Sequence, residues 1–375
     1  MIRLEKVTKI YPDGTEAVRD VSLEVKKGEL CVLLGPSGCG KTTTMKLINR
    51  LIPVTSGRVF IDGLDNAGID ANELRRNIGY AIQDVGLFPH MTVGENIGTV
   101  PALKGWGKTE RRKRAKELLE LLRMNPDDFI DKYPRELSGG QQQRVGVARA
   151  LGGDPPILLM DEPFGAIDPI TRVELQNEFL KIQQEIQKTI IFVTHDIYEA
   201  IKIGDKIALM KSGQLIQYGS PAELLHKPKD AFVADFVGAD RALKGLQLIR
   251  AKEVMWDAPP TAKMNETPKA VRERMKGEGI DWLAIVDDEG RFLGWVVESD
   301  LEKGLKLNDI VQASQITTTG NAVLSEALSL MLTTNLDVLI LAVVDKHMRL
   351  EGVLTFEAIK EALTRAIDEE SPHER

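Results

Sequence analysis

The sequence predicts two parts, a doubly wound α/β domain with a helical insertion and then a smaller α+β domain built from a repeat. Short β-branched apolar runs, such as Leu30–Leu34, Ile157–Met160 and Thr189–Thr194, alternate with amphipathic stretches over the first part. Runs this short and this apolar are typical of buried parallel strands joined by helices. In the second part, one segment recurs further along the chain. The 375 residues leave room for two or three domains.

Composition and charge narrow the class of protein. The chain is 43% hydrophobic and 28% charged, with a formal net charge of -7. Such values are ordinary for a globular protein, and an acidic chain lacks the basic footprint of nucleic-acid binding. We expect no nucleic-acid partner. The two cysteines, Cys31 and Cys39, lie in a predicted strand and in the loop after it, and we expect free thiols in a reducing cytosol.

Membrane-targeting signals are not evident in the sequence. No apolar run approaches the roughly 18 residues that span a bilayer, and the first residues lack a signal-peptide pattern. We therefore expect any membrane role to come through a partner chain.

A mostly helical stretch, at about residues 92–151, interrupts the α/β alternation. It includes Lys108–Leu122, whose basic run Arg111–Arg114 allows two interpretations. The run is either a nucleic-acid patch or the solvated face of a helix whose leucines pack inward, and the second is favoured. We predict a helical subdomain inserted in a domain that spans residues 1–238.

Residues 239–375 form the second predicted domain. Prolines predict that Trp256–Pro268 is a loop. Both copies of the repeat run helix, strand, turn, strand, helix, and such a small unit rarely buries a core alone. We therefore predict two packed repeats, at about 250–308 and 309–368. The repeated residues are Val286, Asp287, Arg291 and Gly294, which recur as Val344, Asp345, Arg349 and Gly352.

Residues 35–42 read GPSGCGKT and match the phosphate-loop pattern G-x-x-x-x-G-K-[ST]. A predicted strand precedes the loop and a helical pattern, Thr43–Leu51, follows it, which makes a chance glycine turn the weaker alternative. Backbone N–H groups and the helix dipole would bind phosphate oxygens. Lys41 would neutralise the β- and γ-phosphates, and the Thr42 hydroxyl can ligate magnesium. The nucleotide-binding candidates here are Gly35, Pro36, Ser37, Gly38, Cys39, Gly40, Lys41, Thr42 and Thr43.

Two further motifs supply candidate hydrolytic residues. ILLMDEP, residues 157–163, is an apolar strand that ends in carboxylates. Asp161 is placed to hold magnesium, and Glu162 to orient and deprotonate the attacking water. LSGGQ, residues 137–141, precedes a helical stretch and could form a second anion site at a helix N-terminus. Its candidate residues are Ser138, Gly139, Gly140 and Gln141.

Together these motifs resemble those of the ABC ATPases, over residues 1 to about 238. The resemblance implies a P-loop NTPase core and hydrolysis of ATP with magnesium. It also implies that two copies pair head to tail, with ATP between the phosphate loop of one and the LSGGQ turn of the other. The implied catalytic residues are Glu162, His195, Lys41 and Gln83, and the implied metal ligands are Thr42, Gln83 and Asp161.

The same resemblance assigns three other positions. Tyr11 lies where the family stacks an aromatic ring on adenine, although a packed tyrosine at a strand edge is the alternative. Asp168, in FGAID, matches the loop that contacts the second subunit. Gln83 matches the glutamine that links the ATP site to the helical subdomain, and His195 matches the histidine that contacts the γ-phosphate.

The wording of GKTTTMKLINRLIPVTSG and ELRRNIGYAIQDVGLFPHMTVGENI is similar to the ATPases of quaternary amine importers. Those take up glycine betaine, carnitine, choline or proline and end in paired CBS modules, which the repeat resembles. The resemblance implies a peripheral subunit on the cytoplasmic face of the plasma (inner) membrane, with a role in osmoprotection. Its partners would be an integral permease, docked beside Gln83 against residues 85–91, and indirectly a substrate-binding protein. Ordinary core packing of Leu87 and Phe88 is the alternative to docking.

Two other functions stay open at this point. One is an importer ATPase for a different solute, such as a polyamine or a metal chelate. The other is an adenine-nucleotide sensor whose cassette binds without hydrolysis, against which Glu162 and His195 argue.

The repeat leaves its own ligand open. CBS modules that bind adenine nucleotides carry G-x-x-T-x-x-D, and here each copy is incomplete, with Val297 at one Thr position and Ala358 at one Asp position. An adenine nucleotide or a cyclic dinucleotide are the candidate ligands. Residues 241–276 carry a net charge of +5 and residues 277–375 a net charge of -11. We hypothesise either a sensor of ionic strength at an anionic membrane surface or a solvated linker. The basic strip includes Lys269, Arg272, Arg274 and Lys276.

Overall fold

The computed structural model describes residues 2–368 except 84–85, 166, 168, 302–306, 312–315 and 334–338. The chain divides into two compact units, residues 1–224 with 228–236, and residues 225–227 with 237–375. None of the helices in the described part of the chain is both long and apolar enough to cross a membrane.

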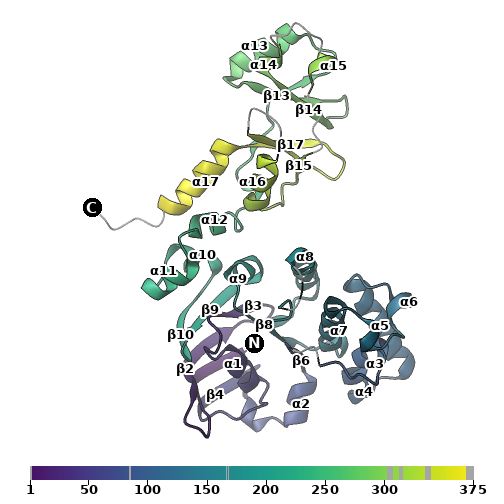
Figure 1. The fold of residues 1–375 in the computed structure, drawn as a ribbon, viewed down its shortest axis with the longest axis vertical. Coiled ribbons are helices and arrows are strands. Elements are labelled where there is room, and N and C mark those ends of the chain that lie inside the picture. Colours follow the sequence, from purple (N-terminus) through teal and green to yellow (C-terminus); the bar gives the residue numbers. More distant parts are fainter. Residues whose placement is uncertain are drawn as a thin grey trace. The chain divides into compact units, whose positions relative to one another are not determined.

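A six-stranded sheet forms the centre of the first unit, in the order β10-β9-β3-β8-β7-β6 (Figure 1). Its first five strands in chain order pair in parallel, and β10 closes one edge antiparallel to β9. Every residue of β3, β7 and β8 is buried, which confirms the predicted α/β core. The strands are β3 (Leu30–Leu34), β6 (Ile78–Ala81), β7 (Ile157–Asp161), β8 (Thr189–Thr194), β9 (Lys206–Lys211) and β10 (Gln214–Gly219).

A second, antiparallel sheet in the first unit was not predicted from the sequence. Its order is β2-β1-β4-β5, and its apolar face packs on the helix that follows β3. That helix, α1, lies in one core with side chains of both sheets, including Ile2, Leu33 and Met45. The elements are β1 (Ile2–Ile10), β2 (Glu16–Val25), α1 (Lys41–Ile48), β4 (Ser56–Ile61), β5 (Leu64–Asp65), the 3-10 helix η1 (Asn66–Gly68) and α2 (Ala71–Arg76).

The predicted helical insertion lies between β6 and β7. Leu118 and Leu119 are buried, and Arg112 pairs with Asp131 at 2.7 Å, so the basic run is a solvated, ion-paired helix face as favoured above. The elements are α3 (Val93–Ile97), α4 (Thr99–Leu103), α5 (Lys108–Leu121), α6 (Pro126–Phe129), η2 (Pro134–Glu136) and α7 (Gly139–Gly152). Four more helices follow, α8 (Pro169–Ile186), α9 (Ile197–Ile203), α10 (Pro221–His226) and α11 (Ala231–Val237).

The second unit contains two sheets, β12-β13-β14 and β11-β17-β16-β15. The prediction of a loop over Trp256–Pro268 was wrong in part, because two short strands form there against distant partners. The elements are α12 (Arg241–Gly245), η3 (Ala251–Glu253), β11 (Trp256–Asp257), β12 (Thr261–Lys263), α13 (Pro268–Glu278), β13 (Trp282–Val286), β14 (Phe292–Val297), α14 (Glu298–Leu301), α15 (Leu307–Ile310), β15 (Thr317–Thr318), α16 (Leu324–Leu332), β16 (Ile340–Val344), β17 (Leu350–Thr355) and α17 (Phe356–Asp368).

The two repeats of this unit face each other with internal two-fold pseudosymmetry. The Phe292 N–H donates to Met348 O at 2.8 Å, and the Leu350 N–H donates to Gly290 O at 3.1 Å. These four residues occupy matching places in the two copies. Trp295, 1% exposed, lies in a core with side chains of both repeats. The repeats therefore share a core, as the size of each unit predicted.

Candidate active site

The glycine-rich loop between β3 and α1 is enclosed by backbone on two sides. A Cβ at Gly35 would lie 2.2 Å from Met210 O, and a Cβ at Gly40 would lie 2.3 Å from Ala17 O. Gly40 also has φ 103, which L-residues rarely adopt. Gly38, with φ 76, faces open space. Glycine is therefore required at Gly35 and Gly40, and the loop is open to solvent at Gly38, as a phosphate-binding loop would need to be.

Lys41 begins α1 and is buried, with 5% of its surface exposed. Its Nζ donates to Gly35 O at 2.7 Å and to Pro36 O at 2.9 Å. The ammonium is thus held against the loop by bonds that phosphate oxygens can replace. Cys39, beside it, is a free thiol like Cys31, as predicted. Burial raises the pKa of the Cys39 thiol, so it is not a thiolate nucleophile at neutral pH.

Thr42 and Asp161 come together at the ends of α1 and β7. The Thr42 hydroxyl donates to Asp161 Oδ1 at 3.0 Å. The pKa of Asp161 is raised, mainly because the carboxyl is buried. The hydrogen bond from Thr42 opposes this shift, and the charge of Glu162 adds to it. A hydroxyl and a carboxylate beside a phosphate loop are the hard oxygen donors that magnesium prefers. No group of three His, Cys, Asp or Glu side chains in the described part of the chain could hold a metal alone. The residues fit a magnesium ion shared with a bound phosphate.

Glu162 is held between two polar side chains from other elements. Gln83 Nε2 donates to Glu162 Oε2 at 3.5 Å, and His195 Nδ1 lies 3.3 Å from Glu162 Oε1. Glu162 has φ 46, in the left-handed region, and its N–H donates to Val193 O at 3.0 Å. This backbone is strained for a glutamate and is of the kind found at functional sites. Three of the four implied catalytic side chains, Gln83, Glu162 and His195, therefore lie together at the carboxyl ends of β6, β7 and β8.

The LSGGQ turn caps α7. Ser138 Oγ accepts from the Gln141 N–H at 3.3 Å, and Gln141 Oε1 accepts from the Ser138 N–H at 2.9 Å, a capping box. The Ser138 hydroxyl keeps its proton for another acceptor. Neither Gly139 nor Gly140 has an atom near its vacant Cβ position. The N-terminus of α7 is therefore open to an anion.

The remaining predicted site residues are placed as follows. In the described part of the chain, no hydrogen bond or ion pair joins residues 138–141 to the phosphate loop. Tyr11 is half-buried after β1, in a turn closed by the Gly14 N–H on Tyr11 O. Asp168 lies outside the described residues, and so does Val85.

A buried carboxylate that was not predicted as a site residue follows His195 by four positions in the chain. Glu199, on α9, is 7% exposed, and its Oε1 accepts from Gln176 Nε2 of α8 at 3.0 Å. The pKa of Glu199 is raised, mainly because the carboxyl is buried. The hydrogen bonds from Thr194 and Gln176 oppose this shift. The charge of Asp196 adds to it, and the charge of Arg172 opposes it. An acidic residue one turn after His195 was the only signal in the sequence. This contact ties the segment that carries His195 to α8.

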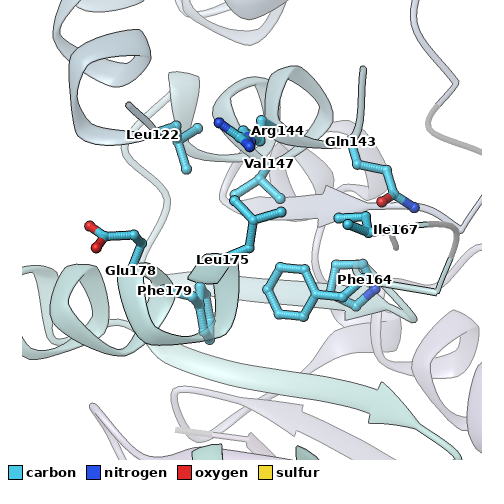
Figure 2. A pocket seen from close by; sticks show the side chains of 10 residues that line it. Leu122, Gln143, Arg144, Val147, Phe164, Ile167, Leu175, Glu178 and Phe179 are labelled. Carbon is cyan, nitrogen blue, oxygen red and sulfur yellow. The ribbon is translucent and has the colours of Figure 1, made fainter. Parts of the chain in front are cut away.

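A pocket separates the helical subdomain from the core behind the LSGGQ turn (Figure 2). Figure 2 shows α7 on one side, with Gln143 and Val147, and α8 on the other, with Leu175 and Phe179. The enclosed volume is about 20 Å³, which is room for roughly one water. Gln143 Oε1 has no hydrogen-bond partner among the described residues. The seam between the two subdomains therefore contains a small cavity next to an amide oxygen.

An ion pair between described residues lies at this seam. Arg123, at the end of α5, pairs with Glu178 of α8 at 2.8 Å. Apart from that contact, the side chains that line the pocket in Figure 2 are mainly apolar.

Comparison with known proteins places these features in a family. Residues 18–165 match the model "ABC transporter", and residues 251–306 and 308–365 match "CBS domain". The chain is 44% identical over 95% of its length to the glycine betaine/carnitine/choline transport ATP-binding protein OpuCA of Bacillus subtilis, of which it covers 94%. It is 49% identical over 79% of its length to the osmoprotectant import ATP-binding protein OsmV of Salmonella typhimurium, of which it covers 79%.

Solved structures agree with this assignment. A dimeric ATP-binding cassette in a post-hydrolysis state, bound to ADP and Pi, is 38% identical with a TM-score of 0.55. The match covers 59% of this chain and 99% of that one. The fold and the phosphate loop thus define an ABC-type ATPase that carries tandem CBS modules. Within that class, the chain belongs to the family of ATP-binding subunits whose members include the transport proteins named above.

We predict that Glu199→Gln stabilises the protein at pH 7. The raised pKa means that the folded state binds more protons than the unfolded state above pH 4.5, so the Glu199 charge lowers stability as pH rises through the folded pKa. Gln removes the charge and can keep the bond to Gln176. Thermal unfolding without nucleotide should show a higher Tm at pH 7, and the gain should disappear near pH 4.

Glu223→Gln is the matched control. A bond from the Ser220 N–H lowers the pKa of Glu223, so its ionised form is favoured in the folded protein. This variant should show no gain in Tm at pH 7. A Glu199→Gln protein that is less stable than the parent at pH 7 would contradict the prediction.

Proposed function

We propose that this chain hydrolyses ATP as one of two head-to-tail copies and drives an importer of quaternary ammonium solutes. The observation that carries the proposal is the grouping of Glu162, Gln83 and His195 beside the Thr42–Asp161 pair. A complete set of acid, base and metal-ligand groups argues against a cassette that only binds nucleotide.

Two copies are needed because one chain covers only part of a triphosphate. The phosphate loop supplies Lys41 and backbone N–H groups, and the open N-terminus of α7 supplies Ser138 and two glycines. These halves do not contact each other within the described part of the chain. A second copy would bring its α7 to the open face of the first loop, so that donors surround the γ-phosphate. Asp168 is our candidate for a contact between the copies.

Hydrolysis follows from the groups around Glu162. A water attacks the γ-phosphorus, the bond from that phosphorus to the oxygen of ADP breaks, and the Glu162 carboxylate accepts the proton of the water. Gln83 and His195 hold the carboxylate, and His195 would also contact the γ-phosphate. Magnesium, held by Thr42, Asp161 and Gln83, would offset the charge on the phosphate oxygens. Tyr11 would stack on the adenine.

The permease would dock in a groove beside Gln83. A hollow of about 300 Å³ is lined by Tyr80, Ile82, Phe88 and Arg149, among others. Phe88 is 41% exposed, so the alternative of core packing is wrong for this residue. Asn96 is fully buried, accepts from the Phe88 N–H at 2.8 Å and donates to Phe88 O. That clamp presents an aromatic side chain on a rigid loop, which suits a helix-in-groove contact.

The solute class rests on the relatives alone. Their names include glycine betaine, carnitine and choline transport. The chain itself would act as a peripheral subunit on the cytoplasmic face of the membrane, reaching the solute-binding protein only through the permease. Uptake of such solutes would serve osmoprotection.

The C-terminal unit is the candidate regulatory part. Asp300 is 8% exposed on α14, and the Thr355 hydroxyl caps α17 by accepting from the Ala358 N–H at 3.1 Å. An adenine nucleotide or a cyclic dinucleotide are its candidate ligands. Sensing of ionic strength is the other candidate function of this unit. That function depends on the basic strip, whereas binding of a nucleotide does not.

Glu162→Gln should separate nucleotide binding from hydrolysis. Gln keeps the size of the side chain and removes the base, so steady-state ATPase activity should fall about 100- to 10,000-fold while ATP still binds. The variant with ATP should elute as a dimer in size-exclusion chromatography. Glu253→Gln, which alters a carboxylate in the second unit, is the control and should keep full activity. Normal turnover by Glu162→Gln would remove Glu162 from the reaction.

Solute class is tested with the reconstituted transporter. Proteoliposomes that contain the chain and its permease should take up labelled glycine betaine, carnitine or choline on addition of ATP. Proline and a polyamine serve as comparison solutes. Uptake of the polyamine alone, with intact ATPase activity, would exclude the quaternary amine class and keep the importer.

Neutralising Lys269 and Lys276 should flatten the response of the transporter to salt. Both side chains are exposed on α13, and Lys269 lies 4.0 Å from Glu273 in a solvent-exposed ion pair. Arg274 instead pairs with Glu266 at 2.7 Å and is held within the module. A membrane-bound cation contributes roughly 1 kcal/mol at low ionic strength. ATPase activity in anionic proteoliposomes should therefore depend less on KCl in the double Gln variant. An unchanged activation curve would refute the ionic-strength hypothesis.

A further inference from the structure

Lys9, near the end of β1, is a buried lysine without a carboxylate partner. It is 8% exposed, and its Nζ donates to Pro53 O at 2.9 Å. The ammonium lies over the ring of Tyr11, 5.4 Å from the ring centroid. No ion pair to Lys9 occurs within the described residues. A buried ammonium needs compensation, and here one carbonyl and one aromatic face supply it.

We propose that Lys9 is a positioning residue that orients and polarises the Tyr11 ring for stacking on the base of the nucleotide. The inference rests on the proposed role of Tyr11. Because the ammonium occupies one face of the ring, the base takes the other face. The ammonium draws π-electron density toward itself, so the free face becomes a better partner for an electron-rich purine.

Lys9 also relates the Tyr11 ring to the phosphate loop. The backbone of Tyr11 is fixed by a turn, in which the Tyr11 N–H donates to Thr15 O at 2.9 Å. Pro53 follows shortly after α1, the helix that begins at Lys41. The bond from Lys9 to Pro53 O therefore links the aromatic ring to the segment that carries the phosphate-binding lysine. One side chain thus sets both the electronics and the place of the ring.

This arrangement predicts an effect on the base and none on the phosphates. Magnesium tripolyphosphate contacts the phosphate loop but has no base to stack. A change at Lys9 that acts through the ring should weaken binding of an ATP analogue and leave tripolyphosphate binding unchanged. A change that damages the fold of the loop should weaken both ligands alike.

The test compares Lys9→Met, Lys9→Arg, Tyr11→Ala and the Lys9→Met/Tyr11→Ala pair in the full chain. Met keeps an apolar stem of similar length without the charge, and Arg keeps the charge. Equilibrium binding of Mg-AMP-PNP and of magnesium tripolyphosphate gives the Kd values, and steady-state kinetics gives KM and kcat. Lys9→Met should raise the Kd for Mg-AMP-PNP about 3- to 10-fold. KM for ATP should rise with it, kcat should stay within about twofold, and Lys9→Arg should restore most of the affinity.

The double variant distinguishes an effect of Lys9 that acts through the Tyr11 ring from an effect that does not need the ring. If Lys9 acts through Tyr11, Lys9→Met has no further effect in the Tyr11→Ala background. The inference is overturned if Lys9→Met leaves the Kd for Mg-AMP-PNP unchanged, weakens tripolyphosphate equally, or acts fully without the Tyr11 ring. If Tyr11→Ala itself binds Mg-AMP-PNP normally, the proposed stacking fails as well. That outcome is distinct from the one in which only Lys9 proves irrelevant.

Discussion

The backbone carbonyls that close around the phosphate loop constrain the rest of the first unit. Ala17 O comes from β2 of the antiparallel sheet, and Met210 O comes from β9 of the parallel sheet. They leave space at Gly35 and Gly40 for hydrogen alone, so the loop is held where the two sheets meet. Its conformation then sets the positions of Lys41 and Thr42, and through Thr42 that of Asp161. A change that moves the two sheets apart would therefore disturb the anion site even if the residues of the loop stayed the same.

How clearly the sequence predicts each strand depends on whether the strand is buried on both faces or on one. Strands β3, β7 and β8 are buried on both faces, so they stand out in the sequence as continuous apolar runs. The antiparallel sheet gave no such signal, because β2 is buried on one face only and β1 changes register near Val7 and Lys9, which breaks the alternation. Short strands such as β12 exist because of pairing with a distant partner, which local sequence does not encode.

The active site divides in the same way. Contiguous motifs, such as the phosphate loop and the LSGGQ turn, carry their mechanism in residue type and spacing, and the structure gives each a suitable local geometry. The left-handed backbone of Glu162 and the partners of Lys9 and Glu199 were not predictable from the sequence. They depend on Val193, Pro53 and Gln176, which are remote in the chain. Their roles require side chains brought together by the fold.

The C-terminal unit offers fewer free charges than its sequence implies. The net charge of +5 over residues 241–276 counts Arg274, which is engaged with Glu266, and Lys244, which is 4% exposed. Lys269, which pairs with Glu273 at 4.0 Å on the surface, and Lys276 are exposed. A contribution of roughly 1 kcal/mol each would be a weak membrane attachment for one chain. A pair of copies would present each of these lysines twice, so its attraction to an anionic surface would be larger. Because attraction to an anionic surface is screened over a Debye length of about 10 Å at 0.1 M salt, the paired state would release more steeply than a single chain. An ionic-strength response through these lysines would therefore be strengthened by the same pairing that we propose for the ATP site.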